Sequence, residues 1–206
     1  MKLVDLSIEE FLAKTASGSP VPGGGSIAAL SAAIAAGLSE MVANLTIGKK
    51  GFEAKEKQMK VIAKAAVDYR NKLIKDIDRD SDAYNDVLKA FKLPKGNKQE
   101  ENNRKQAIQD AFKNAALVPL DVAKNAFKII DLAEGVVKHG NKNAVTDGAV
   151  AVMMARTSVL SALYNVKINL SSIKDKDFAK RIRKDVTSLE SEIEKKERKI
   201  LSLLSI

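Results

Sequence analysis

The chain has 206 residues, a formal net charge of +9 at pH 7, no cysteine and one histidine. These counts exclude disulfides, thiolate catalysis and metal sites built from cysteine or from several histidines. The length and the composition, rich in alanine, leucine and lysine but poor in aromatic residues, predict one helical domain, 1–206, with a sizeable core. The positive charge favours an anionic partner.

The first predicted helix begins after Ser7, because Ser7 and Glu10 have the spacing of a capping box, and it is expected to stop near Gly18. No cationic stretch followed by a long apolar run precedes it, so we expect no signal peptide and a cytoplasmic protein. The second helix is the alanine-rich run 26–47. This run is long enough to span a membrane, but its alanine-rich composition with an internal Glu40 predicts a buried helix instead.

One face of the alanine-rich helix carries only small residues, which allow another backbone to come close. They are Ala29, Ala33, Ala36 and Gly37. We expect a second copy of the chain to cover this face, because a chain of this length offers few partners for it.

Four more helices are expected, over 53–91, 99–138, 144–171 and 175–204, with no strand-like alternation and no internal repeat. Pro119 is expected to kink or split the second of these helices. His139 precedes a helix-ending glycine and is expected to be exposed to solvent.

The most distinctive segment is Pro20-Val21-Pro22-Gly23-Gly24-Gly25-Ser26, which leads into the alanine-rich helix. Glycine permits close approach of another group, and the first N–H groups of a helix have no partner within it. The segment can therefore present N–H donors to an anion, although a simple turn explains the same residues. It is neither a Walker A loop, which ends in Gly-Lys-Ser/Thr, nor a dinucleotide fingerprint, which follows a strand.

The helix predicted over 53–91 has a carboxylate on its apolar face. That face runs through Leu73, Ile77, Tyr84, Val87 and Phe91. Asp80 lies three residues after Ile77 and four before Tyr84, so it belongs to the same stripe, whereas Asp78 and Asp82 lie on the neighbouring flank. A carboxylate among apolar side chains is either a structural ion pair or a functional acid or base.

The helix predicted over 144–171 repeats this pattern. Its inward stripe contains Val150, Ala151, Met154, Ser158 and Ser161. The stripe extends back to Asp147 and forward to Asn165 and Asn169. An acid in the first turn also stabilises a helix through its dipole, and asparagines also join helices by hydrogen bonds, so structural roles remain open for all three.

Together these segments resemble the cyclodeaminase domain of the formiminotransferase-cyclodeaminase family and its stand-alone bacterial relatives, which include methenyltetrahydrofolate cyclohydrolases. The resemblance covers essentially the whole chain, and the order and spacing of the motifs make it specific. The motifs are Pro20–Ser26, Thr46–Glu53, Asp78–Tyr84, Phe91–Lys95, Val118–Leu120, Gly140–Asn143 with Asp147, and Tyr164–Leu170.

The resemblance implies an all-α bundle of about six helices that forms an intertwined homodimer. It also implies closure of 5-formiminotetrahydrofolate to 5,10-methenyltetrahydrofolate with loss of ammonia, and no metal or redox cofactor is required. We expect Asp80 and Asp147 to exchange the protons, with Asp78 in support. The expected substrate contacts are Gly23, Gly24, Gly25, Ser26, Lys49, Lys50, Tyr84, Asn165 and Asn169.

Lys49 and Lys50 are expected to receive the glutamate or polyglutamate tail of the folate. They stand where some relatives have arginine, and lysine keeps the charge but lacks the bidentate fork. Their structural interpretation is that cations suit the C-terminal end of the preceding helix.

Two alternatives remain. A methenyltetrahydrofolate cyclohydrolase, in which water opens the same ring to 10-formyltetrahydrofolate, would use the same carboxylates. A basic helical binding protein would explain the charge, but the lysines are interspersed with acids and arginines cluster only at Arg181–Arg183. We therefore expect neither a nucleic-acid nor a membrane partner.

Overall fold

The computed structural model describes residues 2–204, and within them it contains six α-helices and no strand. The helices are α1 (Ile8–Thr15), α2 (Gly24–Asn44), α3 (Glu56–Phe91), α4 (Lys98–His139), α5 (Val145–Leu170) and α6 (Lys176–Leu201), with short 3-10 turns η1 (Leu3–Asp5), η2 (Glu53–Lys55) and η3 (Lys142–Ala144). The all-α prediction is confirmed, and the expected ranges differ from the observed ones by a few residues at most ends.

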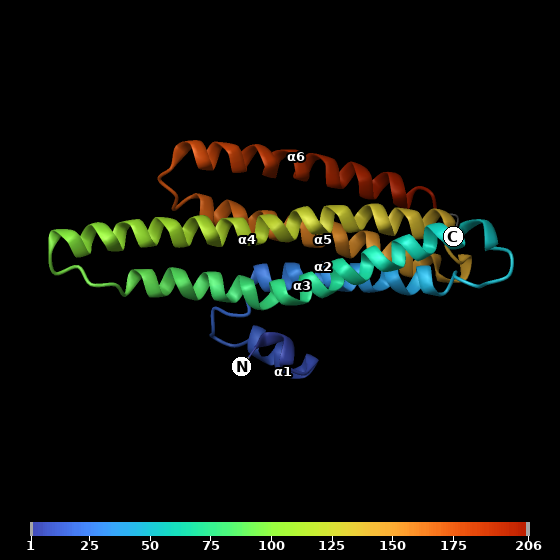
Figure 1. The fold of residues 1–206 in the computed structure, drawn as a ribbon, viewed down its shortest axis with the longest axis horizontal. Coiled ribbons are helices and arrows are strands. Elements are labelled where there is room, and N and C mark those ends of the chain that lie inside the picture. The colour runs from blue at the N-terminus through green and yellow to red at the C-terminus, as the bar shows by residue number, and fades with distance from the viewer. Residues whose placement is uncertain (1, 205–206) are drawn as a thin grey trace.

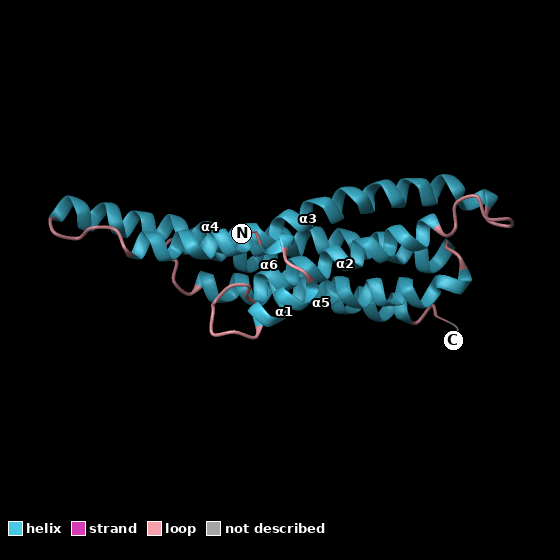
Figure 2. Ribbon diagram, turned by 90° about the horizontal axis from the view of Figure 1, so that it is seen from below, coloured by secondary structure: helices cyan, strands magenta, loops and turns pink. Residues whose placement is uncertain are grey.

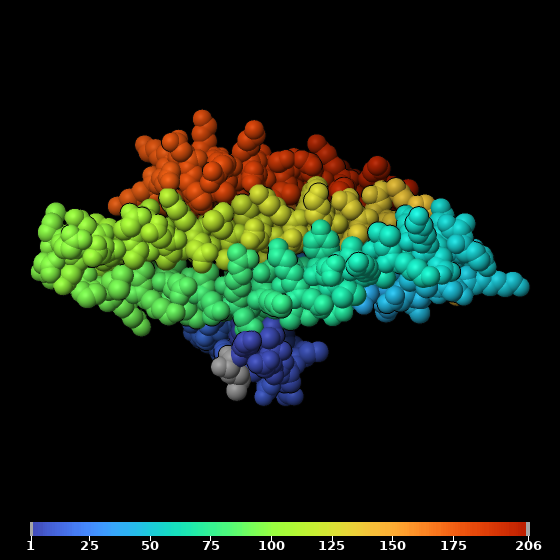
Figure 3. Space-filling model, viewed as in Figure 1, coloured from blue at the N-terminus to red at the C-terminus, as the bar shows by residue number. Residues whose placement is uncertain are grey.

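Helices α2 to α5 form an elongated bundle, with α6 along one side and the short α1 projecting from the other (Figures 1 and 3). Helix α2 packs between α3 and α5, which lie on opposite sides of it (Figure 2). The Ser158 hydroxyl of α5 donates to the carbonyl of Ala28 in α2 over 2.7 Å. Helices α2 and α5 are antiparallel, so the start of α2 lies beside the end of α5.

The small residues of α2 are covered by the chain itself. Ala29, Ala33 and Ala36 are buried, and a Cβ built on Gly37 would lie 3.7 Å from the Cδ of Arg70. The expectation that a second copy covers this face was wrong, because α3, α4 and α5 already do so. The face of α2 that is left uncovered carries large apolar side chains instead. These are Ile34, Met41 and Leu45, each 37–49% exposed.

Two helical segments, Gly24–Asn44 and Lys142–Leu170, are long and apolar enough to cross a membrane by length and composition alone. The most apolar stretch of the first segment is 61% buried inside the protein, and that of the second segment is 50% buried. The core helices of a bundle pass the same test, and the prediction that the alanine-rich helix is buried is confirmed.

Local signals at the helix ends behave as expected. The Ser7 hydroxyl accepts from the Glu10 N–H over 3.2 Å, and the Glu10 carboxylate accepts from the Ser7 N–H over 2.8 Å, which completes the capping box. Pro119 does not split α4, which is continuous across it. His139 is half-buried rather than exposed.

The burial of the apolar stripes of α3 and α5 was predicted less well than the helices themselves. Tyr84 and Phe91 of α3 and Val150 of α5 were expected to face the core, but each is exposed. These residues lie near the edge of the packed face, where a small rotation of the helix decides between burial and exposure.

Candidate functional site

A cavity of about 310 Å³ lies where α2 begins. The ends of α3 and α4 near this cavity extend beyond the first residue of α2 (Figure 1). The cavity has the size of a small-molecule site. Its lining residues are Pro20, Val21, Gly23, Gly24, Gly25, Asp80, Tyr84, Val87, Phe112, Ala115, Asn165, Ile168 and Asn169.

The Asp80 carboxylate lies against the first turn of α2. The Ser26 hydroxyl donates to the carbonyl of Ile77 over 2.9 Å and lies 3.3 Å from Oδ2 of Asp80. Burial raises the pKa of Asp80, while hydrogen bonds from the Ser26 hydroxyl and backbone N–H partly oppose that rise. A carboxyl with a raised pKa at a cavity wall is suited to take up and return a proton near neutral pH.

Two glycines of the Pro20–Ser26 segment lie close to side chains of other helices, and at Gly25 a side chain has no space. A Cβ on Gly25 would overlap the Asp80 carboxylate, and a Cβ on Gly24 would lie 3.1 Å from Nδ2 of Asn165. Neither glycine has a positive φ, and in the described part of the chain only Gly48 and Gly51 do. The Asp80 carboxylate already lies against this turn, where a ligand anion was expected to meet the N–H donors.

The two asparagines of α5 line the opposite wall. Nδ2 of Asn165 donates to the carbonyl of Ser161 over 2.9 Å, and Nδ2 of Asn169 donates to the carbonyls of Ala115 and Asn165, both over 2.9 Å. Since every one of these partners is a carbonyl oxygen, the amide nitrogens must face them. The Oδ1 atoms remain as hydrogen-bond acceptors for a ligand.

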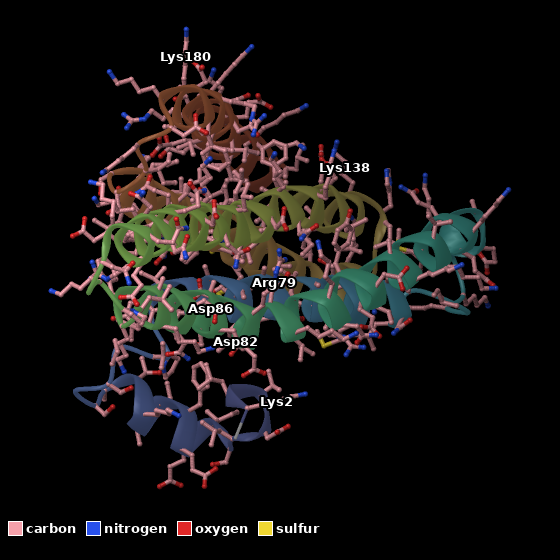
Figure 4. All side chains as sticks on the ribbon, turned by 60° about the vertical axis from the view of Figure 1, so that its left-hand side comes forward. Lys2, Arg79, Asp82, Asp86, Lys138 and Lys180 are labelled. Carbon is pink, nitrogen blue, oxygen red and sulfur yellow. The ribbon has the colours of Figure 1, made fainter. Side chains whose placement is uncertain are left out.

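Asp78 and Asp82 both lie outside the cavity lining. Oδ1 of Asp78 accepts from the backbone N–H of Leu3 over 2.6 Å and holds η1 against α3. Asp82 is exposed on the surface of α3, close to Asp86 (Figure 4). Asp78 therefore anchors the N-terminal segment to α3, close to Asp80 along the helix but outside the cavity.

The other predicted residues lie far from the cavity within one chain. Asp147 is in the first turn of α5, 18 residues before Asn165, which corresponds to about 27 Å along the helix. Lys49 and Lys50 follow the opposite end of α2, where Nζ of Lys49 donates to Oδ1 of Asn141 over 2.8 Å. One chain therefore does not bring Asp147 or either lysine to Asp80.

We call this second group, formed by Thr46, Lys49, Lys50, Asn141 and Asp147, the far-end cluster. Asn141 is buried, and its backbone N–H donates to the Thr46 hydroxyl over 2.8 Å, which joins the loop after α2 to the connection between α4 and α5. The surroundings are positively charged: burial, together with Lys55, Lys138 and Lys142, lowers the pKa of His139. Figure 4 shows Lys138 at the surface of α4 near this end.

The cavity is poor in charge. Among the described residues that line it, Asp80 is the one ionisable carboxylate, and none is lysine, arginine or histidine. An anionic ligand in the cavity would therefore need its cations from elsewhere.

An ion-pair network fixes α3 to α4 beside the site. Arg79, labelled in Figure 4, forms ion pairs with Asp121 of α4 at 3.1 Å and with Asp76 of α3 at 3.3 Å. Burial raises the pKa of Asp76, and the hydrogen bond from Arg79 opposes that rise. The network lies one turn from Asp80 and holds the register of the two helices there.

Several cavity residues were missed in the sequence. Spacing placed Val87 on the apolar stripe of α3 but did not assign it to a site, and nothing in the local spacing marks Phe112, Ala115 or Ile168. Phe112 packs edge-to-face on Phe91 with ring centroids 6.1 Å apart, an aromatic pair that only the α3–α4 packing creates.

Comparison with known proteins gives the same family by three routes. The model of the formiminotransferase-cyclodeaminase family matches residues 7–188. A protein of Methylorubrum extorquens named methenyltetrahydrofolate cyclohydrolase is 39% identical over 186 residues, which cover 90% of this chain and 89% of that protein. Rat formimidoyltransferase-cyclodeaminase is 32% identical over 187 residues, but the match covers only 35% of that longer protein.

The crystal structure of formiminotetrahydrofolate cyclodeaminase from Thermotoga maritima superposes with a TM-score of 0.86 at 33% identity, covering 97% of this chain and 96% of that one. The similarity therefore extends over the whole bundle, including the segments that build the cavity. By sequence and by fold, the chain is an enzyme of the formiminotransferase-cyclodeaminase family.

Proposed function

We propose that this enzyme closes 5-formiminotetrahydrofolate to 5,10-methenyltetrahydrofolate and releases ammonia. The observation that carries the proposal is the Asp80 carboxyl, whose pKa is raised by burial at the wall of a cavity of suitable size. The solved relative from Thermotoga maritima, which bears the cyclodeaminase name, supports it.

In this reaction N10 of the folate attacks the formimino carbon, and the C–N bond to the departing amine then breaks. When the formimino group starts protonated, N10 loses one proton and the leaving nitrogen gains one, so a single carboxyl can accept the first proton and return it to the amine. Asp80 is placed for that exchange at the edge of an apolar cavity. The step balances without a metal or redox cofactor.

Asn165 and Asn169 provide the hydrogen-bond acceptors of the proposed site. A pterin ring presents N–H donors along its pyrimidine edge, and Oδ1 of Asn165 and Oδ1 of Asn169 are acceptors on one wall. Gly24 and Gly25 lie beside Asn165 at the start of α2, and Tyr84 lines the cavity near Asp80. The pterin would then lie over the start of α2, with its pyrimidine edge on the asparagines of α5 and its reacting carbon toward Asp80 of α3.

A homodimer would supply what one chain lacks. The uncovered face of α2 and α5 carries Ile34, Met41, Leu45, Val150 and Met153, each 37–49% exposed. The cavity lies at one end of this helix pair and the far-end cluster at the other, about 30 Å apart along α2. A twofold axis near Ile34, the middle residue of α2, would place the cavity of each subunit beside the far-end cluster of its partner.

In that arrangement the far-end cluster of one subunit covers the cavity of the other. Asp147 would approach Asp80 as the second acid or base, and Lys49 and Lys50 would reach the carboxylates of the folate tail. The +9 charge of each chain suits a polyglutamylated tail. The substrate class implies a cytoplasmic enzyme of one-carbon metabolism.

A second candidate is methenyltetrahydrofolate cyclohydrolase. The observation that favours it is the Methylorubrum extorquens relative of that name, which matches this chain over nearly its full length. Water would attack the same carbon and give one proton to Asp80, which would pass it to N5 as the bond between that carbon and N5 breaks. The remaining hydroxyl proton would leave to solvent as the formyl carbonyl forms, giving 10-formyltetrahydrofolate.

The deciding experiment is turnover of the purified protein on both folates side by side. The methenyl product absorbs in the near ultraviolet, so cyclodeaminase activity gives a rise in absorbance with the formimino substrate. A decay of methenyltetrahydrofolate faster than in buffer, with no rise from the formimino substrate, replaces the first proposal by the second. If neither substrate responds and salt-sensitive DNA binding is found, the protein is a basic binding protein instead.

A further inference from the structure

Helix α4 runs through Pro119 without a break. In an α-helix each N–H donates to the carbonyl four residues earlier, and proline has no N–H. The carbonyl of Ala115 therefore lacks its donor within α4. Both residues are buried, so that carbonyl must find a partner from another element.

The partner is the side chain of Asn169 in α5. Its Nδ2 donates to the carbonyl of Ala115 over 2.9 Å and to the carbonyl of Asn165 over 2.9 Å, which uses both amide hydrogens. A flipped amide would set oxygen against oxygen at both contacts, so the structure admits one orientation. In that orientation Oδ1 of Asn169 remains an acceptor on the cavity wall.

We propose that Pro119 is a positioning residue for substrate recognition. By withholding an N–H from the carbonyl of Ala115, it reserves that carbonyl for Asn169 and so fixes Oδ1 of Asn169 as the acceptor for an N–H edge of the ligand. The identification of this edge with the aminopyrimidinone ring of a folate rests on the proposed function. The fixed amide itself is a property of the protein alone.

Replacing Pro119 with alanine restores the N–H, which then competes for the carbonyl of Ala115. The Asn169 amide loses its α4 partner, and the carbonyl of Asn165 alone then opposes a flip, so the orientation of the amide is held less firmly. The expected result is a rise of about 2- to 10-fold in the KM for the folate, which corresponds to the loss of one neutral hydrogen bond. The kcat is expected to change by less than about 2-fold. Pro94→Ala, in an exposed loop, is the matched control and is expected to leave KM unchanged.

A double-mutant cycle separates positioning from a general structural effect. Asn169→Ala removes the acceptor, so it is expected to raise KM, and adding Pro119→Ala to it is expected to raise KM no further. Additive effects of the two substitutions would overturn the proposal. Pro119→Ser supplies the same N–H with a different side chain and is expected to behave like Pro119→Ala if alanine disturbs folding.

The last measurement needs no substrate. Hydrogen exchange of the Asn169 side-chain amide, followed by NMR in the folate-free protein, is expected to be slow in the wild type and fast in Pro119→Ala. Unchanged slow exchange would overturn the positioning role even if the enzyme turns over folates. If the wild type binds no tetrahydrofolate but exchange accelerates in the variant, the proposed function fails while the positioning of Asn169 stands.

Discussion

The Asp80 carboxylate occupies the space that a side chain on Gly25 would fill. The two residues are 55 positions apart in the sequence, and the contact places the carboxyl directly on the first turn of α2. The glycine lets the carboxyl pack there, and Ser26, the next residue, supplies its hydrogen bonds.

Gly25→Ala is therefore expected to displace the Asp80 carboxylate. Overpacking of this kind costs about 1–3 kcal/mol of unfolding free energy, and misplacing a catalytic group by about 1 Å can cost about 10²-fold in turnover. Urea denaturation and steady-state kinetics measure the two effects. Gly18→Ala is the control, because nothing lies within 4 Å of a Cβ there. Equal activity of both variants would contradict the contact.

Asp80→Asn is expected to lower turnover by about 10²-fold or more, the usual contribution of a general acid or base. Asparagine is nearly isosteric, so the fold should persist, as circular dichroism would show. Asp82→Asn, on the exposed flank of α3, is expected to keep nearly full activity. Full activity of Asp80→Asn would mean that this carboxyl is structural.

The raised pKa of Asp80 also predicts a pH dependence of stability. For a carboxyl whose pKa is higher in the folded state, the stabilisation is fully present below the unfolded-state pKa of about 3.9 and is lost as the pH rises through the folded-state value. Asparagine does not titrate. The free energy of unfolding of the wild type should therefore fall relative to Asp80→Asn over this pH range, measured by urea denaturation at several pH values. A difference that is independent of pH would contradict the assignment.

Subunit mixing tests whether the site is shared. Asp80→Asn and Asp147→Asn are each expected to be inactive as homodimers. Co-expression of the two gives heterodimers in which one of the two shared sites keeps both carboxylates, so random pairing should restore about a quarter of wild-type activity. Each variant purified alone is the control. No recovery on mixing would show that Asp147 does not serve the partner's cavity.

Ile34→Glu is expected to separate the subunits, because it places a charge in the middle of the uncovered α2–α5 face. Sedimentation equilibrium should show a shift from dimer to monomer, and activity should fall as the dimer dissociates. Val61→Glu, at an exposed apolar residue of α3 away from this face, is the matched control and should remain dimeric. A wild-type protein that is monomeric and fully active at nanomolar concentration would exclude the dimer.

The sequence by itself determined the helices and drew attention to Asp80. Helix formation depends on neighbours within a few positions, so the capping box at Ser7 and Glu10 and the apolar spacings were sufficient to find each element. Asp80 stood out for the same reason: its place on the helix face follows from its distance to Ile77 and Tyr84. The order of the motifs along the chain then identified the family.

Only the tertiary structure decided which of the marked residues meet. Helical spacing gives the face on which a side chain lies, but not which end of the bundle it reaches. Asp147 and Asn169 lie on the same helix, yet only Asn169 lines the cavity. The role of Pro119 likewise depends on a donor that arrives from α5, 50 residues further along the chain. Packing between distant helices makes these contacts, and no local pattern records them.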